Sequence, residues 1–254
     1  MLLHSNSMSS YAFERQLCGS LGKHLHLVAM DLPGHGRSGN AVNPSAAYTL
    51  PGYADVLVQF VQTLGIEDAV FAGWSLGGHI LLEASPRLSS AKGFMIFGTP
   101  PLGVPPAIDS AFLATNPAAG LSFQYHLSNA ELERYGASLF APENNRIPDF
   151  FYKDARRTDP ESRSQLLFSV GTLNYRDEIA AVSNMQVPLA ILHGEEDQAI
   201  SLEYIRRLNI PMLWLGEVQI IKKSGHTPQW EAPKAFDAIL RAFIRDITSC
   251  HGSR

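Results

Sequence analysis

Residues 69–83 read Ala-Val-Phe-Ala-Gly-Trp-Ser-Leu-Gly-Gly-His-Ile-Leu-Leu-Glu, and this stretch decides the fold. Its first four residues are typical of a buried parallel strand, and its last four begin a helical pattern. Between them stands G-x-S-x-G, the pattern of a nucleophile elbow, in which a sharp strand-to-helix turn holds a serine above the sheet. We therefore predict Ser75 as a nucleophile with strained backbone angles. Gly73 and Gly77 are predicted as positions where a Cβ would collide with a neighbouring strand or helix.

The residue after the nucleophile predicts part of an oxyanion site. The backbone N–H of Leu76 lies at the start of the predicted helix, where it can meet a developing negative charge. Trp74 flanks the nucleophile, and we weigh two roles for it, lining a substrate pocket or simple packing.

Two further catalytic candidates follow Ser75 in the chain. Residues 189–192 read as a buried strand that leads to Asp197, and residues 218–221 read as another that leads to His226. The order serine, acid, histidine is that of the α/β-hydrolases rather than of chymotrypsin or subtilisin. His226 would be the general base towards Ser75, and Asp197 would hold its tautomer. Glu195 and Glu196 are alternative acids, and Asp197 is favoured by its spacing of three residues after Gly194.

The motifs along the chain resemble those of the α/β-hydrolase fold over nearly its whole length. Within that fold the chain resembles the metal-independent N-acyl-homoserine lactonases, bacterial quorum-quenching enzymes. The segments that carry this likeness are Asn6-Ser7, Gly52-Tyr53-Ala54-Asp55, Gly73 to Ile80, Gly98-Thr99-Pro100-Pro101 and Phe236-Asp237-Ala238.

The resemblance implies site residues beyond the triad. The Asn6 N–H would be the second oxyanion donor, on a loop where the family has His-Gly and this chain has His4-Ser5. The Cβ of Ser5 restricts the backbone angles of this turn, so it is open whether the Asn6 N–H points towards the site. Tyr135 corresponds to the cap tyrosine that hydrogen-bonds an acyl-homoserine lactone.

The βα pattern of the chain is interrupted once, between about Pro100 and Asn184. This stretch lacks apolar strand runs and reads as short helices over 129–140, 147–156, 160–170 and 176–183. We predict a hydrolase core over residues 1–101 and 185–254 and a helical cap over 102–184. A cap of this kind covers the nucleophile, excludes water and shapes the substrate pocket.

The start of the chain suggests an exposed sheet edge. Family members carry about two more strands before this point, so the predicted strand His24–Met30 becomes the edge of the sheet. Its apolar run has no proline or lysine, and such an edge is a template for pairing with another chain. We therefore expect dimerisation through this edge, or aggregation.

Composition limits the possible partners and compartment. The 254 residues are 45% hydrophobic, with a net charge of −4 and a pI of about 6.1, so no basic field attracts nucleic acid. No apolar run is long enough to span a membrane. Cys18 and Cys250 form no disulfide framework, which fits a cytoplasmic protein. We expect a small-molecule substrate, no cofactor and no metal; the pair His24 and His26 has no acid cluster nearby.

Several functions remain open from sequence. The first expectation is hydrolysis of a lactone ring through a serine acyl-enzyme. A general carboxylesterase and a C–C bond hydrolase share the same serine chemistry. A ligand receptor that retains the triad but turns over slowly is the alternative outside enzymes, and an inactive chain is the last.

Overall fold

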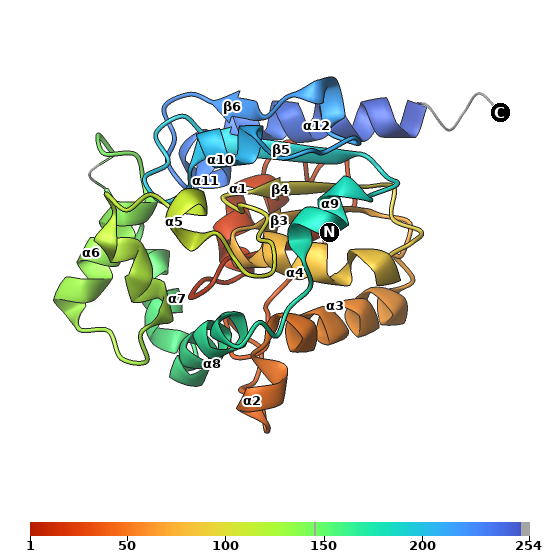
Figure 1. Cartoon of the computed structure of the whole chain (residues 1–254). Coiled ribbons are helices and arrows are strands. Elements are labelled where there is room, and N and C mark those ends of the chain that lie inside the picture. Colours follow the sequence, from red (N-terminus) through yellow and green to blue (C-terminus); the bar gives the residue numbers. More distant parts are fainter. Residues whose placement is uncertain (145, 250–254) are drawn as a thin grey trace.

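A computed structural model describes residues 1–144 and 146–249 of the chain (Figure 1). One parallel sheet in the strand order β2-β1-β3-β4-β5-β6 forms its centre. The strands are β1 (Leu2–Leu3), β2 (Ala29–Met30), β3 (Val70–Trp74), β4 (Gly93–Phe97), β5 (Leu189–Gly194) and β6 (Gln219–Ile221).

Helices cover both faces of this sheet. In Figure 1, α3 and α4 lie on one side of the strands and α12 on the other. Outside residues 102–171 the helices are α1 (Glu14–Leu17), α2 (Pro44–Ala47), α3 (Leu50–Leu64), α4 (Leu76–Ala84), α9 (Glu178–Ser183), α10 (Leu202–Arg206), α11 (Pro228–Glu231) and α12 (Pro233–Ser249). Short 3₁₀ turns add η1 (Ser10–Phe13), η2 (Ser85–Arg87) and η4 (Trp214–Gly216).

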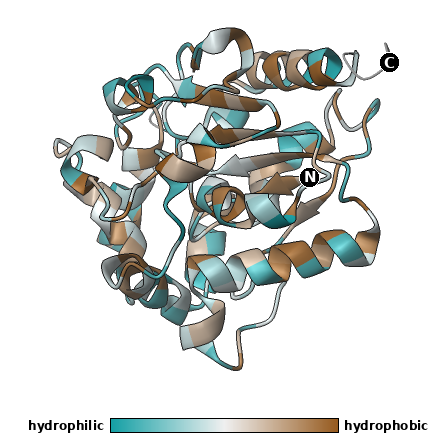
Figure 2. Cartoon of the chain, turned by 45° about the vertical axis from the view of Figure 1, so that its right-hand side comes forward, coloured by the Kyte–Doolittle hydropathy of each residue, from teal (hydrophilic) through white to brown (hydrophobic). Residues whose placement is uncertain are grey.

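Alternation along the strands creates a separate apolar core on each face. In β3, Phe71 packs with α3 and α4, whereas Ala72 and Trp74 pack with α12. In β4, Phe94 and Phe97 divide between the faces in the same way. Figure 2 shows α3 and α12 carrying hydrophobic residues along part of their surface and hydrophilic residues along the rest, as amphipathic helices on a sheet require.

The elements of the predicted cap interval that precede α9 lie together at one end of the molecule, to the left in Figure 1. They are α5 (Ile108–Ala111), η3 (Pro117–Phe123), α6 (Asn129–Leu139), α7 (Asp149–Arg157) and α8 (Pro160–Gly171). Ser128 and Glu131 form a capping box at the start of α6, which fixes where this helix begins. The last helix of the predicted cap interval, α9, packs instead against α4, where Glu178 meets His79.

The predicted strand over His24–Met30 is wrong for its first five residues. Only Ala29 and Met30 pair, with Leu2 and Leu3 of β1, and the residues before them are turns or irregular. β1 itself has two residues, and β2 has no other neighbour among the described residues, so the ladder ends there. β2 is the edge strand, but it is not the long apolar edge that the dimerisation hypothesis needs, and short edge strands resist pairing.

Candidate active site

The elbow places Ser75 at the junction of β3 and α4. Its φ of 52° and ψ of −113° lie outside the regions that serine ordinarily adopts, so the predicted strain is present. A Cβ on Gly73 would stand 2.5 Å from the Gly77 carbonyl, and one on Gly77 would stand 2.5 Å from the Leu3 carbonyl oxygen. Both glycines are therefore required for the reason predicted, close packing of the helix against the sheet.

The loop after β1 lies directly beside the elbow. Leu3 is in register with Gly73, and the missing Cβ of Gly77 makes room for the carbonyls of Leu3 and His4. His4 is fully buried, with Nε2 accepting the Leu32 N–H and Nδ1 at 2.7 Å from the Ser5 carbonyl oxygen. The His4 ring therefore connects the loop after β1 to Leu32.

The backbone angles of this loop show which residue takes the conformation that was expected at Ser5. Ser5 does not take a positive φ; the left-handed residue is Ser7, with φ of 62°. The N–H groups of Asn6 and Leu76 donate to no acceptor in the part of the chain that the structure describes. Neither N–H is therefore committed to another described residue. The Asn6 side chain is committed elsewhere, since its Nδ2 donates to the Ser122 carbonyl at 2.7 Å.

Asp197 and His226 come together at the ends of β5 and β6. Oδ2 of Asp197 lies 2.9 Å from Nδ1 of His226, and both side chains are buried. Oδ1 of Asp197 accepts the N–H groups of Ala199 and Ile200. Burial alone would raise the pKa of this carboxyl, but the imidazole and the N–H donors outweigh it, so the pKa lies below its usual value. Asp197 is therefore an ionised acceptor that fixes the ring of His226.

The two alternative acids do not reach the histidine. Glu195 accepts the Lys223 N–H at 3.4 Å, and neither Glu195 nor Glu196 contacts His226 among the described residues. The Ser75 hydroxyl makes no hydrogen bond to His226 in the described structure, and in this chemistry that bond often tightens only when substrate binds.

The imidazole of His226 is enclosed by elements of both the core and the cap. Trp74 donates its indole N–H to the His226 carbonyl at 2.8 Å, and the His226 N–H donates to Leu139 at the end of α6. Gly98, with φ of 59°, lies so close that a Cβ there would stand 2.7 Å from Cε1 of His226. Trp74 is 1% exposed, so its observed contacts are with the histidine loop and the apolar core.

Tyr135 lies inside the cap with a free hydroxyl. The residue is 2% exposed, its ring packs on Phe151 at 5.4 Å, and its hydroxyl bonds to no residue that the structure describes. Burial raises the pKa of this phenol, so it stays protonated and can donate.

Comparison with known proteins decides the family. The model of the alpha/beta hydrolase family matches residues 1–239. The chain belongs to the alpha/beta hydrolase family. It is therefore a hydrolase, and its relatives include esterases and a lactonase.

The fold of this hydrolase matches those of solved structures over nearly its full length. A mutant of the N-acyl homoserine lactonase AidH, complexed with N-hexanoyl homoserine lactone, has a TM-score of 0.92 and 35% identity, covering 98% of this chain and 90% of that one. A putative aryl esterase from Burkholderia cenocepacia has a TM-score of 0.78 and 22% identity, covering 98% and 90%. Among curated proteins, the bifunctional esterase/perhydrolase DCH of Acinetobacter calcoaceticus is 23% identical over 257 residues, covering 95% of this chain and 90% of its own.

Sequence reasoning missed one residue that organises the hydrolase site, Glu231. One of its carboxylate oxygens accepts the Gly225 N–H and the Thr227 hydroxyl, on either side of His226. The other accepts the Ala141 N–H, just beyond α6. Glu231 therefore links the histidine loop to the cap. The only sequence signal was its position five residues after His226, which is weak.

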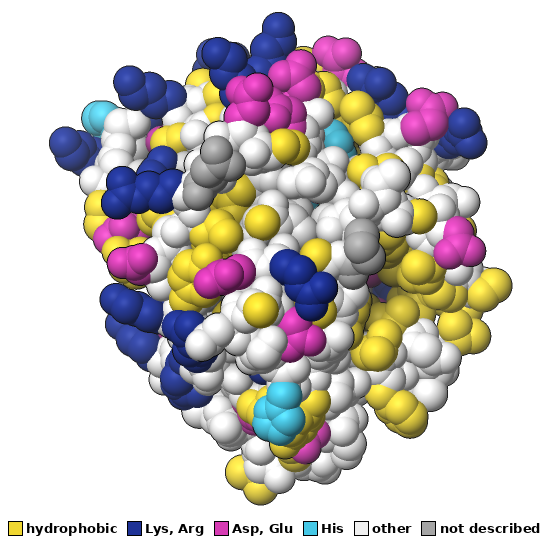
Figure 3. Space-filling model, turned by 90° about the vertical axis from the view of Figure 1, so that its left-hand side faces the viewer, with side chains coloured by type: hydrophobic (Ala, Val, Ile, Leu, Met, Phe, Trp, Pro, Cys, Tyr) yellow, Lys and Arg dark blue, Asp and Glu magenta, His cyan; other side chains and the backbone are white. Residues whose placement is uncertain are grey.

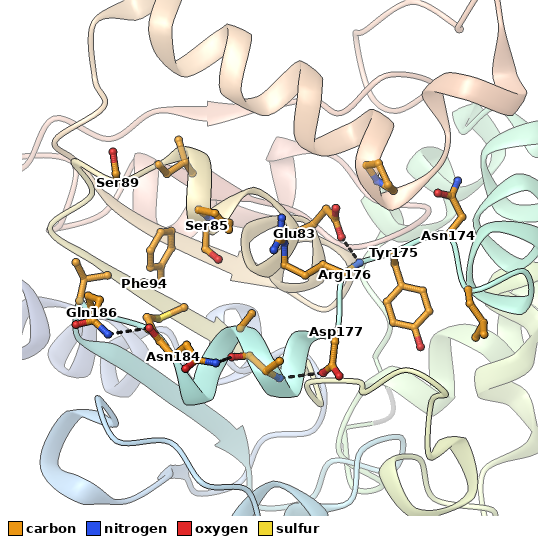
Figure 4. Close-up of a pocket in the computed structure, with 18 residues that line it drawn as sticks. Glu83, Ser85, Ser89, Phe94, Asn174, Tyr175, Arg176, Asp177, Asn184 and Gln186 are labelled. Atoms are coloured by element: carbon orange, nitrogen blue, oxygen red, sulfur yellow. Dashed lines mark hydrogen bonds between the residues drawn. The ribbon is translucent and has the colours of Figure 1, made fainter.

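Two cavities lie away from the elbow and the Asp197–His226 pair. One of about 860 Å³ lies at the far end of α4 (Figure 4), where Glu83 accepts the Arg176 N–H and Asp177 caps α9. Another of about 620 Å³ lies beside Tyr11 and Trp230, with Arg15 stacked over the indole. Neither cavity is lined by Ser75, Asp197 or His226.

Neither the charges on the face shown in Figure 3 nor the potential metal ligands of the described residues indicate another site. Figure 3 shows positive and negative side chains interspersed on the cap face, without a field of one sign. Among residues 1–144 and 146–249, no three His, Cys, Asp or Glu side chains converge as metal ligands. No helix in these ranges is both apolar enough and long enough to cross a bilayer.

Replacing Gly98 with alanine should damage catalysis more than folding. The new Cβ would press on the His226 ring and the residue would have to keep φ at 59°, so the imidazole should move from Ser75. We expect kcat on p-nitrophenyl butyrate to fall about 10- to 100-fold, as small misplacements of catalytic groups do. Gly120→Ala, at an open position in η3, is the matched control. Equal activity in the two variants would contradict this assignment.

Acid should unfold this hydrolase through two buried histidines. Burial lowers the pKa of His4 to about 4, and burial with the nearby His4 ring lowers that of His35 to about 3. Both values lie below the unfolded value of about 6.5, so the unfolded chain binds more protons and the free energy of unfolding falls as pH falls from about 6.5 to 4. Burial raises the pKa of Asp154 to about 6, which opposes this trend in the same window.

Urea unfolding of His4→Gln at several pH values measures the effect. Between pH 6 and 4.5, its free energy of unfolding should depend on pH less steeply than that of the wild type, by about 1.4 kcal/mol per pH unit. The exposed control His24→Gln should retain the wild-type slope. The account of His4 fails if both variants keep the same slope.

Proposed function

We propose that this hydrolase opens the ring of N-acyl-homoserine lactones through a Ser75–His226–Asp197 triad. The observation that carries the substrate is the 35% identity, along 98% of the chain and through the cap, to a lactonase solved with N-hexanoyl homoserine lactone. The Tyr135 hydroxyl supports it, since a donor that bonds to no described residue can bind the amide or lactone of the ligand. The corresponding biological role would be quorum quenching.

The mechanism uses groups already described. His226 takes the proton of Ser75 as Oγ attacks the lactone carbonyl, while Asp197 holds the imidazole and stabilises its charged form. The N–H groups of Leu76 and Asn6 receive the oxyanion. The ring oxygen leaves as an alcohol that takes the proton from His226 and stays tethered to the acyl-enzyme. Water, deprotonated by His226, then attacks the acyl carbon; His226 returns this proton to Ser75 Oγ as the hydroxy acid is released.

We further propose residues 1–101 and 185–254 as core and 102–184 as cap. The helices between β4 and β5, apart from α9, lie together at one end of the molecule. The hydrogen bonds from Asn6 to Ser122 and from His226 to Leu139 support the cap's place over the catalytic loops. Trp74 would contribute to substrate binding through its hold on the His226 loop rather than through an exposed face.

A substrate panel tests the proposal. The purified protein, with EDTA present, is given lactones with acyl chains from short to long, and p-nitrophenyl esters of matching acyl length. We expect lactone opening, read as acid release, with a kcat/KM at least tenfold above that of the matched ester. Brisk ester hydrolysis without lactone opening would favour the carboxylesterase, and tight lactone binding without turnover would favour the receptor.

A further inference from the structure

The cap helix α8 carries a buried arginine that pairs with no carboxylate among the residues that the structure describes. Arg163 is 4% exposed, and its guanidinium bonds to neutral oxygens rather than to an ion pair. Its Nε donates to the Gln124 carbonyl at 2.8 Å, and Nη2 donates to the Tyr125 carbonyl at 3.2 Å. Nη1 reaches the Ala155 carbonyl at 3.2 Å and the Ser7 hydroxyl at 3.3 Å. Burying a guanidinium in this way is costly, which points to a role beyond packing.

The Ser7 contact connects this arginine to the loop of the proposed oxyanion site. Ser7 is fully buried and has φ of 62°, a conformation that persists in a non-glycine residue only when its surroundings hold it. Its hydroxyl lies 3.5 Å from Oδ1 of Asn6, the residue whose N–H is free. The Asn6 amide in turn donates to Ser122 of η3.

Arg163 therefore contacts both the cap segment that follows Ser122 and the loop that contains Asn6. It binds the carbonyls of Gln124 and Tyr125, immediately after Ser122, and it also binds Ser7, immediately after Asn6. The oxyanion loop is thus fixed to the cap at two adjacent residues, at Asn6 by its own amide and at Ser7 by the rigid planar guanidinium of Arg163. Lysine could not reproduce this set, because its ammonium is a single point on a flexible stem.

We propose that Arg163 is a positioning residue for the oxyanion site, and that it aims the Asn6 N–H by holding Ser7 in its left-handed conformation. This role rests on the proposed function. Arg163 touches no reacting atom. Its loss should misdirect a donor that acts only on the transition state, so kcat should fall while KM changes little.

Kinetics of Arg163→Met, Ser7→Ala and the double variant test this role, with p-nitrophenyl butyrate and N-hexanoyl homoserine lactone as substrates. We expect kcat to fall about 10- to 100-fold for Arg163→Met, because complete loss of one oxyanion donor costs about 10²- to 10³-fold. KM should stay within about threefold. Ser7→Ala should lower kcat about tenfold, and the double variant should be no worse than Arg163→Met, since both changes break one connection.

The control is Arg157→Met. Arg157 also joins the cap to the core, through the Ser38 carbonyl at 2.9 Å, but it has no contact with the oxyanion loop. It should keep the wild-type kcat. If Arg163→Met does not fold, Ser7→Ala, which retains the arginine and its three carbonyl contacts, decides the question by the same split between kcat and KM.

The outcomes separate the two proposals. A wild-type protein without activity on either substrate would overturn the proposed function and the role of Arg163 together. An active wild type whose folded Arg163→Met or Ser7→Ala variant keeps its kcat, or changes only in KM or melting temperature, would overturn the role of Arg163 alone. Additive losses in the double variant would do the same.

Discussion

Replacing Ser75 with alanine is expected to lower kcat on lactones and esters by about 10⁴-fold or more while leaving the fold intact. The reason is that the free N–H groups can still bind the carbonyl and the Asp197–His226 pair remains, but no nucleophile is left to attack. Alanine keeps the Cβ that the elbow already accommodates at φ of 52°, so the melting temperature should change by only a few degrees. Steady-state kinetics with thermal unfolding measures both effects.

The matched control for this change is Ser89→Ala, at an exposed serine outside the site. It should show wild-type kinetics. If Ser75→Ala retained more than a few per cent of the activity, the nucleophile would be another group, and the elbow would be a structural turn.

Replacing Asp197 with asparagine is expected to lower kcat by about 10³- to 10⁴-fold. The asparagine Oδ1 can still accept the N–H groups of Ala199 and Ile200, which leaves Nδ2 facing His226. A donor at that position forces the opposite tautomer, with the proton on Nε2, so the ring can no longer take a proton from Ser75. The kinetic constants of Asp197→Asn measure the loss, and circular dichroism verifies the fold.

Glu195→Gln and Glu196→Gln are the controls that decide which acid acts. Neither glutamate contacts His226 among the described residues, so each variant should keep kcat within about threefold of the wild type. A large loss in either one, together with a mild effect of Asp197→Asn, would reassign the acid.

The parts of the fold that sequence could predict are those determined by local pattern. The strands of the sheet centre and the long helices α3 and α12 have enough residues to show their period. The elbow was predictable because its pattern is local: the close contact that requires Gly73 is with Gly77, four positions on, although the contact that requires Gly77 is with Leu3, far away along the chain. Helices of four or five residues, such as α2, α5 and α11, are too short to display a period and were not foreseen.

The remaining features depend on partners far along the chain. The strand at Ala29 is short because, in the described sheet, it pairs with the two-residue strand β1 alone, which a local pattern cannot reveal. The contact between Arg163 and Ser7 joins residues 156 positions apart, and that between Glu231 and Ala141 joins residues 90 apart. In the sequence, Arg163 and Glu231 do not differ from solvent-exposed charges on a helix. The sequence order of serine, acid and histidine was informative because it reflects strand order, which the parallel sheet preserves.

The most direct test of a serine nucleophile that opens lactones is titration of the enzyme with diethyl p-nitrophenyl phosphate. Attack by Ser75 Oγ on phosphorus would release p-nitrophenolate and leave a diethylphosphoryl group on the serine, which cannot then form an acyl-enzyme. We predict one equivalent of p-nitrophenolate per chain, loss of N-hexanoyl homoserine lactone opening in proportion, and the phosphoryl mass on the peptide that contains Ser75. Lactone opening that survives full labelling, or a label on a peptide without Ser75, would contradict the account.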